Sequence, residues 1–204
     1  MTKVIIFNKP YGVICQFSPD LLHPTLKDYI PIPGIYPAGR LDSDSEGLVI
    51  LTNNGQLQSQ ITEPKYKKFK TYLVQVDGVP NSDQLNWLRQ GVELSQASSA
   101  TKVVASYRSS PACVKVIDEP EWLWERQPPI RVRKNLATTW LELAISEGKN
   151  RQVRRMTAKV GLPTLRLVRS AVGGVQLDDL QPGQWRAENY AEFIQQLNLE
   201  QARS

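Results

Sequence analysis

The sequence predicts an α+β domain built on a long, bent and mostly antiparallel sheet with a few helices at its periphery. Short runs rich in branched apolar residues recur along the chain, and such runs are typical of strands. Only a few segments have apolar residues at helical spacing, and no internal repeat is present. A chain of 204 residues is long enough to bury a sizeable core and to form one or two domains.

Local patterns place each strand of this sheet. The run 48–51 is too short for a helix core, and the turn at 53–55 ends it, so we expect a fully buried strand there. Residues 71–76 and 140–146 alternate between apolar and polar, as half-buried strands do. The expected strands are 4–7, 13–17, 48–51, 71–76, 103–107, 113–117, 140–146 and 165–172.

The helices are predicted from apolar spacing and from capping residues. Ser82 and Gly91 are typical of the N-cap and the stop of a helix over 82–90. Val153 and Val160 share one face of a later helix. The expected helices are 56–62, 82–90, a segment ended by Gly161, and an amphipathic C-terminal helix over 188–201.

Composition and charge exclude several classes of protein. Two distant cysteines, Cys15 and Cys113, predict neither a disulfide framework nor a zinc site, and the single His23 argues against a catalytic triad or a histidine-based metal site. No apolar run approaches the roughly 18 residues of a membrane span, and the N-terminus lacks a signal-peptide pattern. We expect a cytoplasmic protein, and its net charge of +5 favours a polyanionic partner.

The stretch 39–55 concentrates acids, arginine and glycine at the mouth of a predicted strand, and its acids have three interpretations. They form a solvated turn, a calcium loop or a catalytic site. Asp42, Asp44 and Glu46 followed by Gly47 imitate the first half of an EF-hand loop, but Asn53 stands where its bidentate glutamate belongs. In the catalytic interpretation Asp42 reacts and arginines surround it.

The same stretch resembles motif II of the RsuA/RluB/RluE/RluF-type pseudouridine synthases. The family pattern is G-R-L-D-x-x-[ST]-x-G-L-[LIV]-[LIV]-L-T-N-[DN]-G, which is far more specific than a short glycine motif. The residues at its fixed positions are Gly39, Arg40, Leu41, Asp42, Ser45, Gly47, Leu48, Leu51, Thr52, Asn53 and Gly55.

Three further segments resemble motifs of this family. The step 9–12, Lys-Pro-Tyr-Gly, matches its opening, and 70–72, Lys-Thr-Tyr, matches the start of a later strand. The segment 147–156 matches motif III, E-G-[RK]-x-[RH]-Q-[IV]-R-R-M. This segment also crowds arginine at the start of a helix, which the helix dipole disfavours unless an anion lies there. The anion would be the Asp42 carboxylate or an RNA phosphate.

The resemblance implies the pseudouridine synthase fold, with a cleft between two lobes, and isomerisation of a specific uridine in large-subunit (23S) ribosomal RNA. It implies that Asp42 is the nucleophile or base, that Tyr72 stacks on the target base, and that Arg154 pairs with Asp42. It fits the RluE branch best and implies no metal and no cofactor; we expect a monomer. The residues that we expect to contact RNA are Arg40, Lys9, Lys70, Arg151 and Arg155, with Arg131 and Arg133 from a long basic and aromatic loop.

The resemblance covers about residues 4–186. We expect residues 1–186 to form the catalytic domain, with a lobe boundary near 63–70, and residues 187–204 to form a C-terminal helix. In the family an S4-type RNA-binding domain normally precedes the Lys-Pro step. Only eight residues precede Lys9, so we expect no such domain here.

Two other functions remain open from the residues alone. A non-catalytic RNA-binding module would explain the basic charge but not the aspartate between matched arginine and tyrosine motifs. A glycoside hydrolase needs two carboxylates, and Asp42 with Asp44 or Glu46 could form such a pair. The basic charge argues against a sugar substrate.

Overall fold

The computed structural model describes residues 1–97, 104–130 and 137–198. Its helices are α1 (Gly55–Thr62), α2 (Ser82–Gln90), α3 (Gln152–Lys159) and α4 (Tyr190–Asn198), with 3-10 turns at Leu26–Asp28 and Pro64–Tyr66. Its strands are β1 (Val4–Lys9), β2 (Tyr36–Pro37), β3 (Glu46–Thr52), β4 (Lys70–Asp77), β5 (Glu93–Ala97), β6 (Val104–Arg108), β7 (Cys113–Ile117), β8 (Thr138–Ile145), β9 (Thr164–Val172), β10 (Val175–Gln176) and β11 (Trp185–Ala187).

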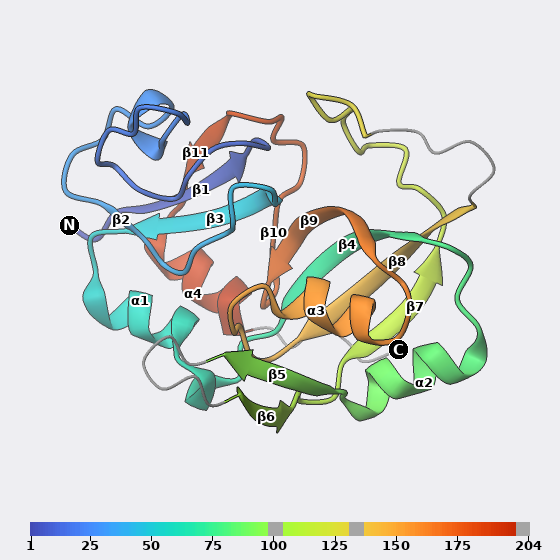
Figure 1. The fold of residues 1–204 in the computed structure, drawn as a ribbon. Helices are drawn as coiled ribbons and strands as arrows, with labels where there is room; N and C mark the ends of the chain where they lie inside the picture. Colours follow the sequence, from blue (N-terminus) through green and yellow to red (C-terminus); the bar gives the residue numbers. More distant parts are fainter. Residues whose placement is uncertain (98–103, 131–136, 199–204) are drawn as a thin grey trace.

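Most strands of the described chain join one mixed sheet. Its order is β11-β1-β3-β9-β4-β8-β7, with β2 beside β3 and β10 beside β9, and every pairing except β3–β9 is antiparallel (Figure 1). Strands β5 and β6 form a separate hairpin. The predicted α+β fold with a mostly antiparallel sheet and peripheral helices is confirmed.

The parallel contact between β3 and β9 divides the sheet into two halves. We call β11, β1, β2 and β3 the β1 half, and β9, β10, β4, β8 and β7 the β4 half. The halves pair only where Glu46 and Gly47 lie opposite Val168 and Arg169. Gly47 has φ +102°, and a Cβ there would lie 2.3 Å from the Arg169 carbonyl oxygen. Only glycine allows this approach.

A buried ion pair reinforces the same junction. Arg166 of β9 donates two hydrogen bonds to the Glu46 carboxylate, at 2.9 and 3.0 Å. The indole of Trp124 donates to Glu46 at 2.8 Å, and the Trp124 carbonyl accepts from Arg166. Because every partner of this buried pair is matched, its desolvation is offset and it fixes the start of β3 against β9.

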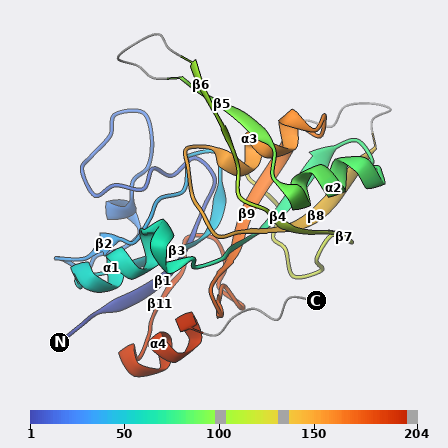
Figure 2. The same ribbon diagram turned by 90° about the horizontal axis from the view of Figure 1, so that it is seen from below.

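Helices cover opposite faces of the two halves (Figure 2). In the β1 half, α1 and α4 pack on one face through Leu57, Ile61, Phe193 and Leu197. In the β4 half, α2 and α3 pack on the face of Tyr72 and its even-numbered neighbours, and residues 13–35 continue this core over β1 and β3. The two cores meet around the β3–β9 junction.

The structure corrects two local predictions and adds two strands. The strand expected over 13–17 is absent; only Ile14 bridges to Thr25, because prolines interrupt the following segment. The N-cap of α2 is Asn81, not Ser82, and Gln84 completes its capping box. The local patterns predict neither β5, which pairs with β6, nor β11, which pairs with β1. None of the described helices has the length and apolar character needed to cross a bilayer.

Candidate active site

A cleft of about 290 Å³ lies where the two halves of the sheet meet. Its walls come from the loop before β3, from β4 and β9, and from the loop between β8 and α3. The polar and charged residues that line it are Arg40, Asp42, Ser45, Thr62, Lys70, Tyr72, Lys149, Asn150, Arg151, Gln152 and Arg169. Five of the predicted site residues therefore share one cleft: Arg40, Asp42, Lys70, Tyr72 and Arg151.

The loop that carries Asp42 is held by backbone hydrogen bonds. The Ser45 amide donates to the Asp42 carbonyl at 3.0 Å, and the Gly12 amide donates to the Ser43 carbonyl at 2.7 Å. The Leu41 amide donates to the thiol of buried Cys15. The opening turn at residues 9–12 thus supports the loop, so the Asp42 side chain is presented from a fixed backbone.

Lys9 does not reach RNA in this arrangement. Its side chain is fully buried, and its ammonium donates to the carbonyls of Pro10 and Val13 at 2.8 Å and of Ser43 at 3.5 Å. Burial lowers the pKa of Lys9 to about 8. The prediction that Lys9 contacts RNA therefore disagrees with this structure. Lys9 instead links the opening turn to the loop that carries Asp42.

Asp44 holds Arg151 beside Asp42. Arg151 donates to both carboxylate oxygens of Asp44, at 2.9 and 2.7 Å, and its Nη1 lies 3.7 Å from Asp42 Oδ2. Burial raises the pKa of Asp44, but the hydrogen bonds from Arg151 and the charge of Arg154 bring it below its usual value. The same hydrogen bonds raise the pKa of Arg151. The anion expected at the arginine-rich start of α3 is therefore supplied by Asp44.

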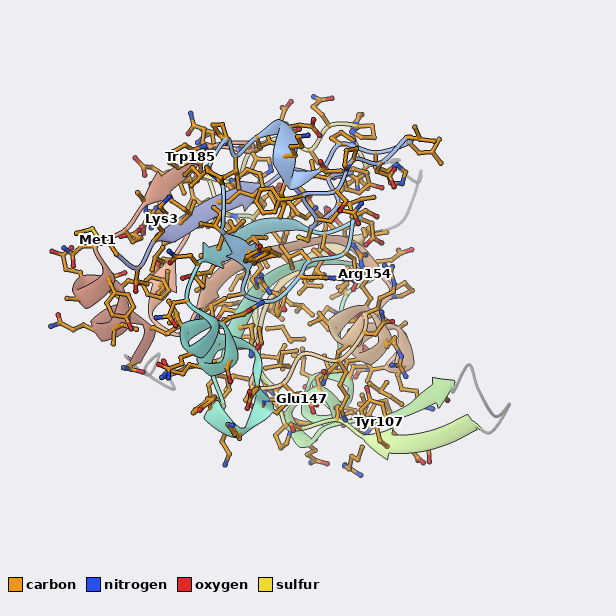
Figure 3. All side chains as sticks on the ribbon, turned by 90° about the vertical axis from the view of Figure 1, so that its left-hand side faces the viewer. Met1, Lys3, Tyr107, Glu147, Arg154 and Trp185 are labelled. Atoms are coloured by element: carbon orange, nitrogen blue, oxygen red, sulfur yellow. The ribbon has the colours of Figure 1, made fainter. Side chains whose placement is uncertain are left out.

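Arg154 differs from its prediction, because it binds Asp44 and forms no ion pair with Asp42. Its Nη2 donates to the Asp44 carbonyl at 2.6 Å, and its Nε lies 3.5 Å from the Asp44 carboxylate. Arg154 projects from α3 toward the β1 half (Figure 3). Burial lowers its pKa, while the charges of Asp44 and Asp42 oppose this shift. Arg151, one turn earlier in left-handed conformation (φ 48°), takes the place beside Asp42.

Tyr72 and Lys70 form one side of the cleft. Both side chains lie on the same face of β4, since residues two apart on a strand point the same way. Arg169 of β9 lies opposite Tyr72 in the sheet register. Burial, and second the charge of Arg169, lower the pKa of Lys70 to about 8.

The remaining predicted RNA-binding residues have different surroundings. Arg40 is exposed at the rim of the cleft. Arg155 donates to the Ser95 carbonyl of β5 and lies over the ring of Tyr107, so it supports the β5–β6 hairpin. Figure 3 shows Tyr107 beside Glu147 at the base of this hairpin. Arg131 and Arg133 lie outside the described residues.

Glu46 is turned away from Asp42 and Asp44. Its carboxylate is buried against Arg166 and Trp124, as described above. The three acids therefore do not converge, and within the described chain no group of three or more acidic, histidine or cysteine side chains could hold a metal ion. The EF-hand interpretation thus loses a ligand, and Glu46 is also unavailable as the second carboxylate of a glycosidase.

The residues of this cleft suit a substrate in which a planar, neutral ring is attached to an anionic chain. One partly exposed carboxylate, Asp42, faces a cleft with an aromatic ring on one side and several cations around it. The Arg151 guanidinium lies 3.7 Å from this carboxylate. A carboxylate can act as a nucleophile or as a base.

Comparison with known proteins identifies the family. A model of the RNA pseudouridylate synthase family matches residues 3–159, more than half of the chain. The chain belongs to this family. The ribosomal large subunit pseudouridine synthase E of Vibrio parahaemolyticus is 55% identical over 184 residues, which is 90% of this chain and 73% of that protein. The ribosomal small subunit pseudouridine synthase A of Escherichia coli is 35% identical over 188 residues, 90% of this chain and 69% of that protein.

A solved structure of the family has the same fold. A crystal structure of a pseudouridylate synthase aligns with a TM-score of 0.75 and 29% identity, over 96% of this chain and 74% of that chain. The resemblance to the RsuA-type synthases, and within them to large-subunit synthase E, is confirmed. The roles of individual residues stay predictions.

Sequence reasoning missed two features of this synthase site. The sequence offers Asp44 only as a calcium ligand or a glycosidase acid, whereas it binds two arginines. The sequence places Arg169 in a strand and gives no sign that it lines the cleft. The arginine-rich start of α3 is the signal that could have pointed to Asp44, because it demanded an anion.

Proposed function

We propose that this synthase isomerises a specific uridine of large-subunit (23S) ribosomal RNA to pseudouridine. The observation that carries this proposal is the single cleft in which the carboxylate of the family motif, Asp42, faces Tyr72 and an arginine. The higher identity to a large-subunit synthase than to a small-subunit one, 55% against 35%, favours large-subunit RNA. A ribosomal RNA substrate implies a cytoplasmic location.

In the proposed reaction Asp42 releases the base from the ribose. The C1′–N1 bond breaks, the base rotates, and C5 forms a new bond to C1′ while the hydrogen on C5 leaves. Asp42 either attacks as a nucleophile or removes the 2′ proton. Arg151 lies 3.7 Å from this carboxylate, and Arg154 acts through Asp44.

The uridine must leave its stack to enter the cleft. Flipping a base costs a few kcal/mol, and stacking on an aromatic ring returns about 1–3 kcal/mol. We propose that Tyr72 provides this ring and that exposed Arg40 and Arg151 contact the RNA backbone at the rim. We propose that residues 1–186 form the catalytic unit and that the protein acts as a monomer.

The experiment that tests this function maps pseudouridines in cells that lack the protein. Carbodiimide labelling followed by primer extension marks each pseudouridine of the large-subunit RNA as a stop. We expect one stop to disappear and to return with the wild-type gene but not with Asp42→Ala. If every stop persists without the protein, the proposed substrate is wrong.

A second arm separates catalysis from RNA binding alone. Asp42→Ala removes a partly exposed carboxylate, so the fold and the affinity for RNA should be kept. Retained binding with loss of product supports an enzyme. If Asp42→Ala restores the stop as well as the wild type does, a role of Asp42 in the chemistry is excluded.

A further inference from the structure

Lys70 is a buried cation without a partner among the described residues. Lys70 is only 7% exposed. No hydrogen bond or ion pair joins its ammonium to another residue of the described chain. Two other buried cations are matched, Lys9 by three carbonyls and Arg166 by Glu46. The Lys70 side chain lines the cleft, so an anion that enters the cleft can supply the partner that its ammonium lacks within the described chain.

Arg169 extends the same positive surface. It is 5% exposed, and its Nε donates to the Leu48 carbonyl at 2.8 Å. Its two Nη atoms have no hydrogen-bond partner within the described chain. Lys70 and Arg169 flank Tyr72, one along the strand and one across the sheet. The ligand of this surface is therefore an anion beside the Tyr72 ring.

Two anions of the proposed reaction could lie here, a phosphodiester and the detached base. The cations suited to phosphates are the exposed ones at the rim, Arg40 and Arg151, because phosphates remain largely hydrated. Lys70 and Arg169 are buried beside the ring on which a flat base would stack. This position fits the base and not the backbone.

We propose that Lys70, together with Arg169, binds the uracil anion that forms when the C1′–N1 bond breaks, and thereby stabilises the departing base. This inference rests on the proposed function. Both electrons of the broken bond stay with N1, and the charge spreads onto the carbonyl oxygens of the ring. Lys70 donates a hydrogen bond to this charge and transfers no proton. When C5 bonds to C1′, its hydrogen leaves as a proton and N1 takes one up from water, so the isomerisation balances.

A hydrogen-bond donor held beside charge that develops in the transition state raises the reaction rate and leaves the affinity for the substrate unchanged. Lys70→Met should therefore slow the single-turnover rate by about 100-fold. The dissociation constant for the RNA should change by less than twofold. A phosphate contact would do the opposite, since losing one lowers the salt dependence of binding by about 0.7 in log–log slope.

The pH dependence gives a second readout. Lys70 has a pKa of about 8, so it carries its charge below that pH and loses it above. The charged and titratable groups that share its cleft are Arg40, Asp42, Tyr72, Lys149, Arg151 and Arg169. We expect the single-turnover rate of the wild type to fall above about pH 8, and Lys70→Arg, which keeps its charge, to remove this fall.

The test uses purified full-length protein and large-subunit ribosomal RNA, with rate, affinity and salt slope measured together. Lys115→Met is the matched control, because Lys115 is an exposed lysine of the same sheet outside the cleft, paired with Glu142. It should leave all three quantities unchanged. Unaltered RNA affinity also shows that Lys70→Met is folded.

The possible outcomes distinguish a failure of this inference from a failure of the proposed function. A slow Lys70→Met with wild-type affinity, and a Lys70→Arg that remains active at high pH, support the inference. A weakened affinity with a lower salt slope and a normal rate would make Lys70 a phosphate contact and overturn it, as would a Lys70→Met that matches the wild type throughout. A wild type that forms no pseudouridine in any ribosomal RNA would instead overturn the proposed function, and the inference with it.

Discussion

Asp44 organises the cations of the cleft by binding two arginines at once. Its carboxylate accepts both hydrogen bonds of Arg151 and lies 3.5 Å from Arg154, while its carbonyl accepts from Arg154 as well. These contacts hold Arg151 with its guanidinium 3.7 Å from the Asp42 carboxylate. We propose that Asp44 positions Arg151 and that Asp42 is the residue that reacts.

We expect Asp44→Asn to impair turnover far more than stability. The pair with Arg151 is partly exposed on both sides, so its loss should cost about 1 kcal/mol or less in the free energy of unfolding. A shift of Arg151 relative to Asp42 should lower turnover roughly 10- to 100-fold. Thermal unfolding and pseudouridine formation at saturating RNA measure the two effects.

Asp178→Asn provides the matched control. Asp178 forms a 2.8 Å ion pair with Arg186, away from the cleft. Its loss should be equally mild for stability and should leave turnover unchanged. Equal turnover in the two variants would mean that Asp44 has no positioning role.

The sequence predicts which residues lie in the cleft where a family motif contains them. It does not predict which side chains are buried. The family motifs located Asp42, Tyr72 and Arg151, which the cleft brings together. Lys9 lies in an equally clear motif, yet its ammonium is buried among carbonyls. Nothing in the local sequence distinguishes a lysine that faces RNA from one that faces its own backbone.

At the scale of elements, the contact between β3 and β9 determines where the cleft lies. Strand β3 begins four residues after Asp42, so the pairing of Gly47 with Arg169 places the reactive loop against the β4 half. Arg169 takes part in the same contact and lines the cleft. The junction of the sheet and the candidate active site are thus one feature.

Gly47→Ala tests this junction. The new Cβ would meet the Arg169 carbonyl at 2.3 Å, at a backbone φ of +102° that L side chains rarely adopt. We expect a loss of about 3 kcal/mol in the free energy of unfolding, and a loss of turnover in the fraction that remains folded. Urea denaturation measures the first quantity.

Gly55→Ala is the comparison for this variant. Gly55 is the first residue of α1, and a Cβ there meets nothing within 4 Å. Alanine in a helix should be neutral or slightly stabilising. If Gly47→Ala is as stable as Gly55→Ala, the close approach of β3 and β9 does not constrain the fold.

Elements with strong local patterns were predictable, whereas those made by distant pairing were not. Residues 48–51, 56–62 and 71–76 carry clear apolar patterns and form β3, α1 and β4. Strand β11 has only three residues and exists because β1 offers it a partner. Such pairing depends on contacts far along the chain, which a local pattern does not contain.

At the scale of the whole molecule, buried lysines make stability depend on pH. Folding lowers the pKa of Lys9 from 10.5 to about 8, so between these values the unfolded chain binds more protons. The free energy of unfolding must therefore rise with pH in this window. Below about pH 8 both states are protonated, and the cost of burying the charge is fully present.

Comparison with Lys9→Met isolates this effect. The stability of the wild type relative to Lys9→Met should increase between about pH 8 and pH 10.5, by on the order of 3 kcal/mol. Lys70 titrates in both proteins, so its contribution cancels. Parallel stability curves for the two proteins over this range would show that Lys9 has an ordinary pKa in the folded state.

In the proposed reaction the Asp42 carboxylate starts the isomerisation of a uridine. The most direct measurement is tritium release from large-subunit ribosomal RNA labelled at C5 of its uridines, because forming the C1′–C5 bond expels that hydrogen. Purified wild-type protein should release one equivalent of tritium per RNA, and Asp42→Asn should bind the RNA equally well and release none. Release by Asp42→Asn at the wild-type rate, or no release by the wild type, would contradict the account.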